Sequence, residues 1–108
     1  MLAFTFAPQA GQGPPAPMSH PVEHDATGSR FTATVEGRLS QLQYRLRDGI
    51  MKIVHTEVPP ELSGHGIAGD LMRAALAWAR SNGWRVQPAC SYAQAFLDAH
   101  AEYADLLA

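Results

Sequence analysis

A glycine-rich segment, Gly64-His65-Gly66-Ile67-Ala68-Gly69, stands directly before a stretch with helical periodicity. Glycine lets backbone N–H groups approach an anion closely, and the N-terminus of a helix adds partial positive charge. With Ser63 in front of it, the segment therefore predicts a site for a phosphate or pyrophosphate. A glycine-rich turn that only caps the helix would have the same composition, so the segment alone leaves both interpretations open.

The spacing Gly-x-Gly-x-x-Gly is also that of a dinucleotide-binding turn. Such a site needs an acidic residue at the end of the next strand, but that strand runs into Gln87-Pro88-Ala89-Cys90. A chain of 108 residues is also too short for two mononucleotide-binding halves. A Walker-type phosphate loop is excluded because no Gly-Lys-Ser/Thr follows. The sequence therefore argues against NAD.

Three other side chains are candidates for acid, base or nucleophilic chemistry. Cys90 stands at a predicted strand end and before a predicted helix N-terminus, where a thiolate is favoured. His55 and Glu57 share a strand face, because residues two apart in a strand point the same way. Each has a structural alternative. A buried cysteine is usually a small apolar residue, and the other two would form only a core hydrogen bond and a salt bridge.

Three strands are predicted to precede the glycine segment. Residues 31–35 alternate between apolar and polar, and residues 39–46 alternate after a bulge expected near Ser40-Gln41. Tight turns at Glu36-Gly37 and Asp48-Gly49 would join them into an antiparallel meander. Residues 50–58 have apolar side chains on both faces, so we expect a central strand covered on both sides.

Helices and a fourth strand are predicted after Pro59-Pro60. Apolar residues repeat with helical spacing from Ile67, and Asn82-Gly83 is a helix stop. Residues 84–89 form a fourth strand, parallel to the third because a helix crosses between them. Residues 91–107 form a second helical region with Ser91 as its N-cap. The fold class is therefore α+β.

The first 29 residues are predicted to be a flexible tail in front of one domain over residues 30–108. Residues 7–17 are rich in Pro, Gly, Ala and Gln and offer little to bury. Met18 would serve as an N-terminus, so residues 1–17 are expected to be an upstream extension. His20 and His24 have ligand spacing, but the intervening Pro21 disfavours a helix. We therefore expect solvated residues there and no metal.

Charge and composition limit the partners. The net charge of −2 gives no broad basic surface for nucleic acid, and no apolar run is long enough to span a membrane. The single cysteine cannot form an internal disulfide, which suits a reducing cytoplasm. The oligomeric state and the acceptor of any reaction are not predicted.

The order of these elements resembles the GNAT superfamily of acyl-CoA N-acyltransferases. Four motifs are similar to those of a small, single-domain branch of predicted acetyltransferases, and the resemblance spans Phe31 to Leu107. They are His-Thr-Glu-Val-Pro at 55–59, Gly-x-Gly-Ile at 64–67, Pro-x-Cys-x-Tyr at 88–92, and Glu-Tyr-x-Asp-Leu at 102–106. The superfamily usually has Arg or Gln at the start of its loop. Glu61 and Leu62 stand there instead, which implies modest affinity for coenzyme A.

The resemblance implies how acetyl-CoA, the co-substrate, would be held. The pyrophosphate would be cradled by backbone N–H groups of the loop, namely those of Ser63, Gly64, His65, Gly66, Ile67 and Ala68. Glu57 and Val58 would lie where the third and fourth strands separate, and their main chain would pair with pantetheine as a strand would.

The resemblance also implies direct attack of an amine on the acetyl-CoA thioester. Many relatives use a tyrosine of the last helix to protonate the departing thiolate, but Phe96 stands near that position, so Tyr92 would have to substitute. Cys90 falls beside the acetyl group, and either His55 or Glu57 would be the base. His100 and Tyr103 would pack the C-terminal segment down.

Two alternatives to an N-acetyltransferase stay open. A small member of a fold can keep its ligand site and lose its chemistry, so the chain would then be a non-catalytic acyl-CoA-binding module. The second alternative is a small interaction domain whose glycine loop binds no ligand. Coenzyme A titration and turnover against a panel of amines separate the three.

Overall fold

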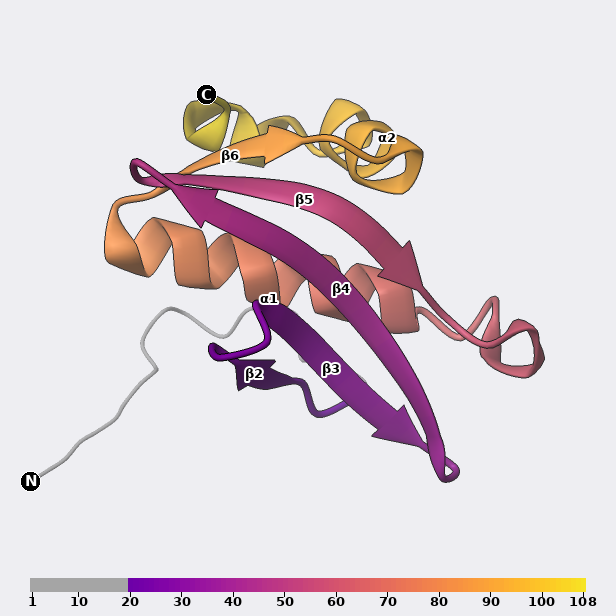
Figure 1. Cartoon of the computed structure of the whole chain (residues 1–108). Coiled ribbons are helices and arrows are strands. Elements are labelled where there is room, and N and C mark those ends of the chain that lie inside the picture. The colour runs from indigo at the N-terminus through magenta and orange to yellow at the C-terminus, as the bar shows by residue number, and fades with distance from the viewer. Residues whose placement is uncertain (1–19) are drawn as a thin grey trace, which may run out of the picture.

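The computed structural model describes residues 20–108, so the extension predicted over residues 1–17 lies outside the described part. One sheet and a layer of helices form the α+β fold (Figure 1). The strands are β2 (Glu23–Asp25), β3 (Arg30–Val35), β4 (Arg38–Arg47), β5 (Ile50–Glu57) and β6 (Arg85–Pro88). The helices are α1 (Ile67–Asn82) and α2 (Ser91–Ala99), and the 3₁₀ turns are η2 (Pro60–Leu62) and η3 (Ala101–Leu106).

The sheet has the order β2-β3-β4-β5-β6. Its first four strands pair antiparallel, and β6 pairs parallel with β5 after the crossover through α1. The predicted meander, the long helix after the glycine segment, and the parallel strand after it are confirmed. Both meander turns place their two central residues at positive φ, at Glu36-Gly37 and at Asp48-Gly49. Such turns match the right-handed twist of the strands.

A β-bulge in β5 decides which side chains face the helices. Gln43 lies opposite His55, and Tyr44 lies opposite Ile53, so Val54 is an extra residue in β5. The side chain of Ile53 faces the core, whereas that of His55 points to the other face. The bulge expected near Ser40-Gln41 is therefore wrong; the irregularity is at Gln43/Tyr44, and the extra residue lies on the opposite strand.

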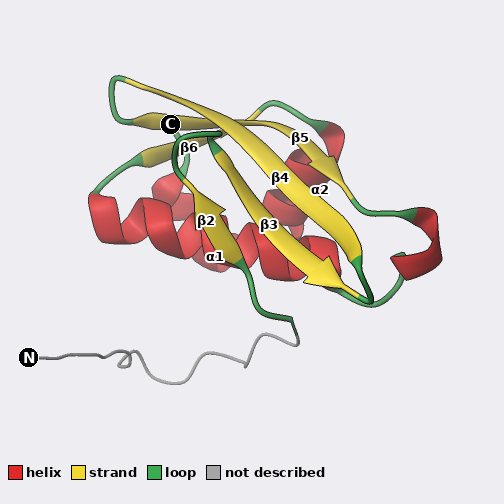
Figure 2. Ribbon diagram, turned by 60° about the horizontal axis from the view of Figure 1, so that its bottom comes forward, coloured by secondary structure: helices red, strands yellow, loops and turns green. Residues whose placement is uncertain are grey.

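Both helices cover the same face of the sheet, and within residues 20–108 no helix covers the opposite face (Figure 2). The expectation that β5 is covered on both sides is therefore wrong. Ile50 and Val54 are half-buried on the open face. We call this helix-free side of the sheet the open face.

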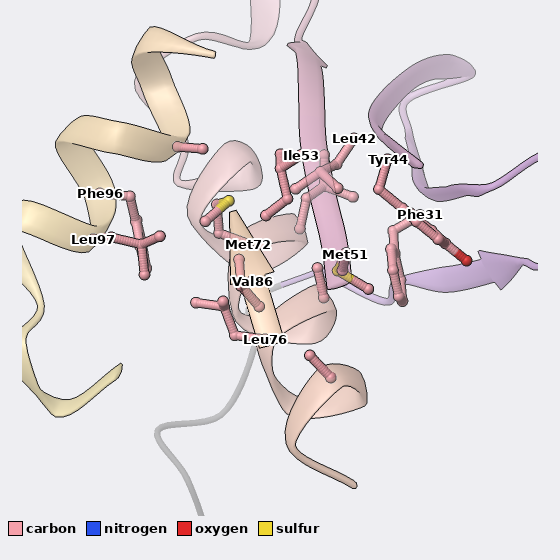
Figure 3. Close-up of a cluster of buried hydrophobic side chains, with 14 of the residues drawn as sticks. Phe31, Leu42, Tyr44, Met51, Ile53, Met72, Leu76, Val86, Phe96 and Leu97 are labelled. Atoms are coloured by element: carbon pink, nitrogen blue, oxygen red, sulfur yellow. The ribbon is translucent and has the colours of Figure 1, made fainter. Parts of the chain in front are cut away.

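The core lies between the sheet and α1. This helix begins after Gly66 and ends at Gly83, as predicted, and it buries Leu71, Met72 and Leu76 completely. Side chains from β3, β4, β5, β6 and α2 meet this stripe (Figure 3). They include Phe31, Leu42, Met51, Ile53, Val86, Phe96 and Leu97.

The C-terminal segment is less regular than predicted. Cys90, not Ser91, is the N-cap of α2, and the helix ends before His100. The chain continues as η3, and Leu107 forms a bridge with Val86. The ring of His100 stacks on Phe96 at 3.9 Å, so His100 packs this segment down as expected.

The predicted tail is wrong for residues 20–29, which belong to the folded domain. Strand β2 pairs with β3, and His24 lies opposite Phe31. The Nδ1 atom of His20 lies 2.8 Å from the buried carboxylate of Asp70 at the start of α1. The composition argument failed here because only three residues pair, too few to give a strand pattern.

His24 should make the stability of the fold depend on pH. Burial lowers the pKa of its imidazole below the ordinary value near 6.5, and the Asp25 carboxylate offsets part of this shift. Above about pH 6.5 this residue is neutral in both states. As the pH falls, the unfolded chain takes up the proton first, so we expect the free energy of unfolding to decrease. Below the folded pKa the effect levels off.

Urea denaturation between about pH 5 and pH 8 tests this expectation, with His24→Gln as the control. Glutamine retains a hydrogen-bonding group for the hydroxyl of Tyr44, which lies 2.6 Å from Nε2 of His24. The variant should lose less stability than the wild type as the pH falls. Equal losses would show that His24 does not contribute.

Candidate functional site

Strands β5 and β6 separate where the site is expected. Their parallel ladder ends at Ile53 and Pro88, and the N–H of Ala89 donates to the Ile53 carbonyl at 2.8 Å. Beyond this point β5 continues to Glu57 and pairs with β4 on one side only, because the segment after β6 turns away into α2. The main chain of residues 54–57 is therefore an open edge, with which an extended ligand can pair.

The glycine segment presents free N–H groups at the start of α1. Gly66 is the N-cap with φ 80°, and no side chain caps the helix. The first helical bond runs from the N–H of Asp70 to the carbonyl of Gly66, so the donors from Gly66 to Gly69 have no acceptor within the helix. Together with the helix dipole they suit an anion.

Two residues predicted to donate to that anion already donate within the loop. The N–H of Ser63 bonds to the Pro60 carbonyl at 3.2 Å, and that of His65 to the Leu62 carbonyl at 3.4 Å. Because these N–H groups are already used, the prediction that Ser63 and His65 donate to the pyrophosphate is corrected. The free donors are those of Gly64, Gly66, Ile67, Ala68 and Gly69, of which the sequence prediction did not include the last.

A hollow of about 260 Å³ lies between this loop and the start of α2, and its walls include Val58, Gly66 and Tyr92. A Cβ at Gly69 would lie 2.9 Å from Nη1 of Arg73 and 3.8 Å from the Tyr92 hydroxyl. Glycine at this position therefore lets both side chains come close to the helix.

Tyr92 is held as a neutral phenol in this hollow. Burial is the largest cause of its raised pKa; Asp70 and Cys90 add to the shift, and Arg73 opposes it. A phenol with a raised pKa keeps its proton at neutral pH. The hydroxyl is therefore able to donate a hydrogen bond or a proton to a ligand in the hollow.

Cys90 lies on the helix side of the open edge. Its sulfur is 3.8 Å from Oγ1 of Thr56 on β5, and it accepts the N–H of Ala93 at 3.5 Å as the cap of α2. The thiol is half-buried. Cys90 therefore forms a wall next to the open edge and also holds the first turn of α2.

His55 and Glu57 share one face of the sheet, as their spacing predicts, and the bulge at Val54 makes this the open face. Nε2 of His55 is 3.8 Å from Oε1 of Glu57, and more than half of each side chain is exposed. The Glu57 carboxylate also accepts Nε2 of Gln41 at 3.2 Å, and Gln41 accepts Nη1 of Arg30 at 3.1 Å. A line of hydrogen bonds across β3 and β4 thus orients Glu57.

The four predicted catalytic residues do not form one cluster. Cys90 and Tyr92 approach the open edge from the helix side, whereas His55 and Glu57 approach from the open face. Sequence reasoning missed Thr56 and Gln41. Simple alternation along β5 would put Thr56 on the face of the sheet that does not carry the core residues. Only the bulge at Val54 turns it toward Cys90.

We expect Cys90→Ala to lower stability by about 1 kcal/mol, because the substitution removes the cap of α2. Cys90→Ser should restore stability, since serine is a good N-cap. Both variants should bind coenzyme A almost as the wild type does, and turnover should fall only modestly. Urea denaturation and steady-state kinetics measure these effects.

The same variants test a covalent role. Intact-protein mass spectrometry after incubation with acetyl-CoA should show no stable acetyl adduct. An adduct present in the wild type and absent in Cys90→Ser would contradict a wall-lining role. Unchanged kinetics in a destabilised Cys90→Ala would remove Cys90 from the site.

Within residues 20–108, no group of three or more His, Cys, Asp or Glu side chains is arranged to hold a metal ion. No helix in this range is long and apolar enough to cross a membrane.

Comparisons with known proteins agree with this geometry. A family model described as GCN5-related N-acetyltransferase matches residues 30–106. Protein NATD1 of Bos taurus is 35% identical over 79 residues, which is 70% of each chain. A GCN5-like candidate N-acetyltransferase of Staphylococcus aureus, solved by NMR, superposes with a TM-score of 0.67 at 27% identity. The match covers 84% of this chain and 91% of that one.

Proposed function

The chain belongs to the GCN5-related N-acetyltransferase family, and from this we propose that it transfers an acetyl group from acetyl-CoA directly to an amine. The observation that carries the proposal is that the site combines free N–H donors at the start of α1 with an open edge on β5. The donors of Gly64 and of residues 66–69 would hold the pyrophosphate. The edge at residues 54–58 would pair with pantetheine and place the thioester beside Cys90.

In the proposed reaction the amine nitrogen attacks the thioester carbonyl carbon. A C–N bond forms, the C–S bond breaks, and the thiolate takes the proton of the Tyr92 hydroxyl. The negative charge on the carbonyl oxygen would be stabilised by a main-chain N–H of the open edge. The proton lost by the nitrogen passes to a base, and we assign this role to Glu57, with His55 as its neighbour.

Titration with acetyl-CoA, coenzyme A and NAD, followed by amide chemical shifts, tests the binding step. Acetyl-CoA and coenzyme A should shift the amides of residues 64–69 and 54–58. NAD should not, because the end of β6 offers no carboxylate for a ribose. Tighter binding of NAD than of coenzyme A would contradict the proposal.

A non-catalytic acyl-CoA-binding module is the second candidate. It is favoured by Phe96, a buried ring with no proton to donate at the position where relatives have a tyrosine. Acetyl-CoA turnover against a panel of amines decides between the two. Binding without turnover of any amine would leave only the module. With one free cysteine and no disulfide, we also propose a reducing compartment such as the cytoplasm.

A further inference from the structure

Charged side chains on the open face are largely segregated by sign, apart from Arg30, which forms an ion pair with Asp25 at 3.2 Å. The pairing register places Glu23, Thr32, Gln41 and Glu57 in one row across the sheet. Two rows further along the strands, Arg45 lies opposite Lys52, which pairs with Gln87 of β6. The side of the face next to the open edge is therefore acidic, and the side next to the β4–β5 turn is basic.

The basic side has no internal neutralisation. None of the ion pairs found within residues 20–108 includes Arg45, Arg47 or Lys52. Like charges directly opposite each other in a sheet are destabilising, so the Arg45 and Lys52 pair carries a cost that the fold itself does not offset. An anionic ligand would offset it.

The same surface is hollowed. One hollow is lined by Arg45, Arg47, Lys52 and Gln87, and also by Asp48 of the turn. A second hollow contains Gln43 and Val54 at the bulge. Both include Ser29 and Arg45, so the two hollows adjoin along β4 and β5, and the second reaches Val54, the neighbour of His55 in the chain.

We propose that the open face binds an extended acidic polypeptide segment, with its lysine at Glu57 and its carboxylates over Arg45 and Lys52. The proposal rests on the proposed acetyl transfer and names the class of acceptor. The amine must arrive on this face, because Cys90, Tyr92 and α2 occupy the helix side of the edge. The side chain of lysine is long enough to reach from the open face of the sheet to the open edge of β5.

The register predicts the spacing of the acceptor motif. Gln41, which bonds to Glu57, and Arg45 are four residues apart on β4. At roughly 3.3 Å per residue, an extended peptide needs about four residues between its lysine and its acidic group. Nucleic acid fits less well, because its backbone phosphates would meet Glu23 and Glu57 at the acidic side.

Fluorescence anisotropy measures binding without requiring turnover. The probe is a labelled peptide with one lysine and Asp or Glu about four residues to each side; Asn and Gln replace the acids in the control peptide. Two or three exposed ion pairs together should give the acidic peptide at least about fivefold tighter binding. The preference should shrink at high salt, because screening weakens exposed pairs.

Variants of the basic side localise the effect. Lys52→Gln should lose most of the preference, and Lys52→Arg should keep it. Arg80→Gln is the matched control, since it removes one positive charge from α1 on the helix side and should keep the preference. Amide shifts with coenzyme A should be the same in all three variants.

Equal binding of both peptides, or a preference unchanged in Lys52→Gln, would overturn the proposal. So would tighter binding of a single-stranded oligonucleotide than of the acidic peptide, which would assign the face to nucleic acid. Failure to bind coenzyme A would instead remove the proposed function, and the peptide preference would still be measured. With turnover, kcat/KM should follow the same order of peptides.

Discussion

Tyr92→Phe is expected to slow acetyl transfer by at least about 100-fold, because loss of a positioned proton donor typically costs two to four orders of magnitude. Acetyl-CoA binding should change little. The phenyl ring that remains still packs on Phe96, whose ring centre lies 6.1 Å from that of Tyr92. The effect should therefore appear in kcat, measured by release of free thiol, and not in the dissociation constant.

The pH profile provides an independent check on Tyr92. Burial raises the pKa of its hydroxyl above the ordinary value of 10.0, so the wild type should keep this proton throughout the neutral range. Loss of activity above about pH 10 should be present in the wild type and absent from the residual activity of Tyr92→Phe. Full activity in the variant would show that the thiolate leaves without help from a phenol.

Gly66→Asp is expected to weaken coenzyme A binding at least tenfold, or about 1.4 kcal/mol. A carboxylate would stand where the pyrophosphate meets the free N–H groups of α1. The fold should survive, because aspartate is a good N-cap and tolerates positive φ better than most residues. Isothermal titration with coenzyme A measures the loss.

Gly37→Asp is the matched control for this variant. Gly37 has φ 75°, close to the φ 80° of Gly66, and a Cβ at either position meets no other atom within 4 Å. Its turn lies between β3 and β4, outside the loop. Gly37→Asp should bind coenzyme A as the wild type does. Equal weakening in both variants would mean that backbone strain, not charge at the anion site, is responsible.

The sequence predicted most of the fold because its strongest signals are local. The turn residues at positions 36–37 and 48–49 require positive φ, and the apolar stripe from Ile67 has a helical period, so neither depends on distant contacts. Strand β2 has only three residues and no such signal. Its place in the sheet depends on the contacts of His20 with Asp70 and of His24 with Tyr44, which join residues far apart in the chain.

The predicted site was limited in a different way. The position of the loop before α1 and the shared face of His55 and Glu57 follow from spacing. The separation of the catalytic candidates by the plane of the sheet follows from one extra residue, Val54, which alternation cannot reveal. The loss of Ser63 and His65 as donors follows from η2, a short turn whose own hydrogen bonds use them.

The bulge makes the site depend on how β5 pairs with β4 more than on the identity of Val54. Val54→Ala or Val54→Thr keeps the extra residue, and His55 and Glu57 stay on the open face. If Val54 instead paired as a regular strand residue, strict alternation would turn both side chains into the apolar core and rotate Thr56 away from Cys90. Deleting Val54 would leave the ladder continuous, with His55 still opposite Gln43 and Glu57 still opposite Gln41. Along this strand, a shift in its pairing with β4 is therefore more damaging than a change of the side chain at Val54.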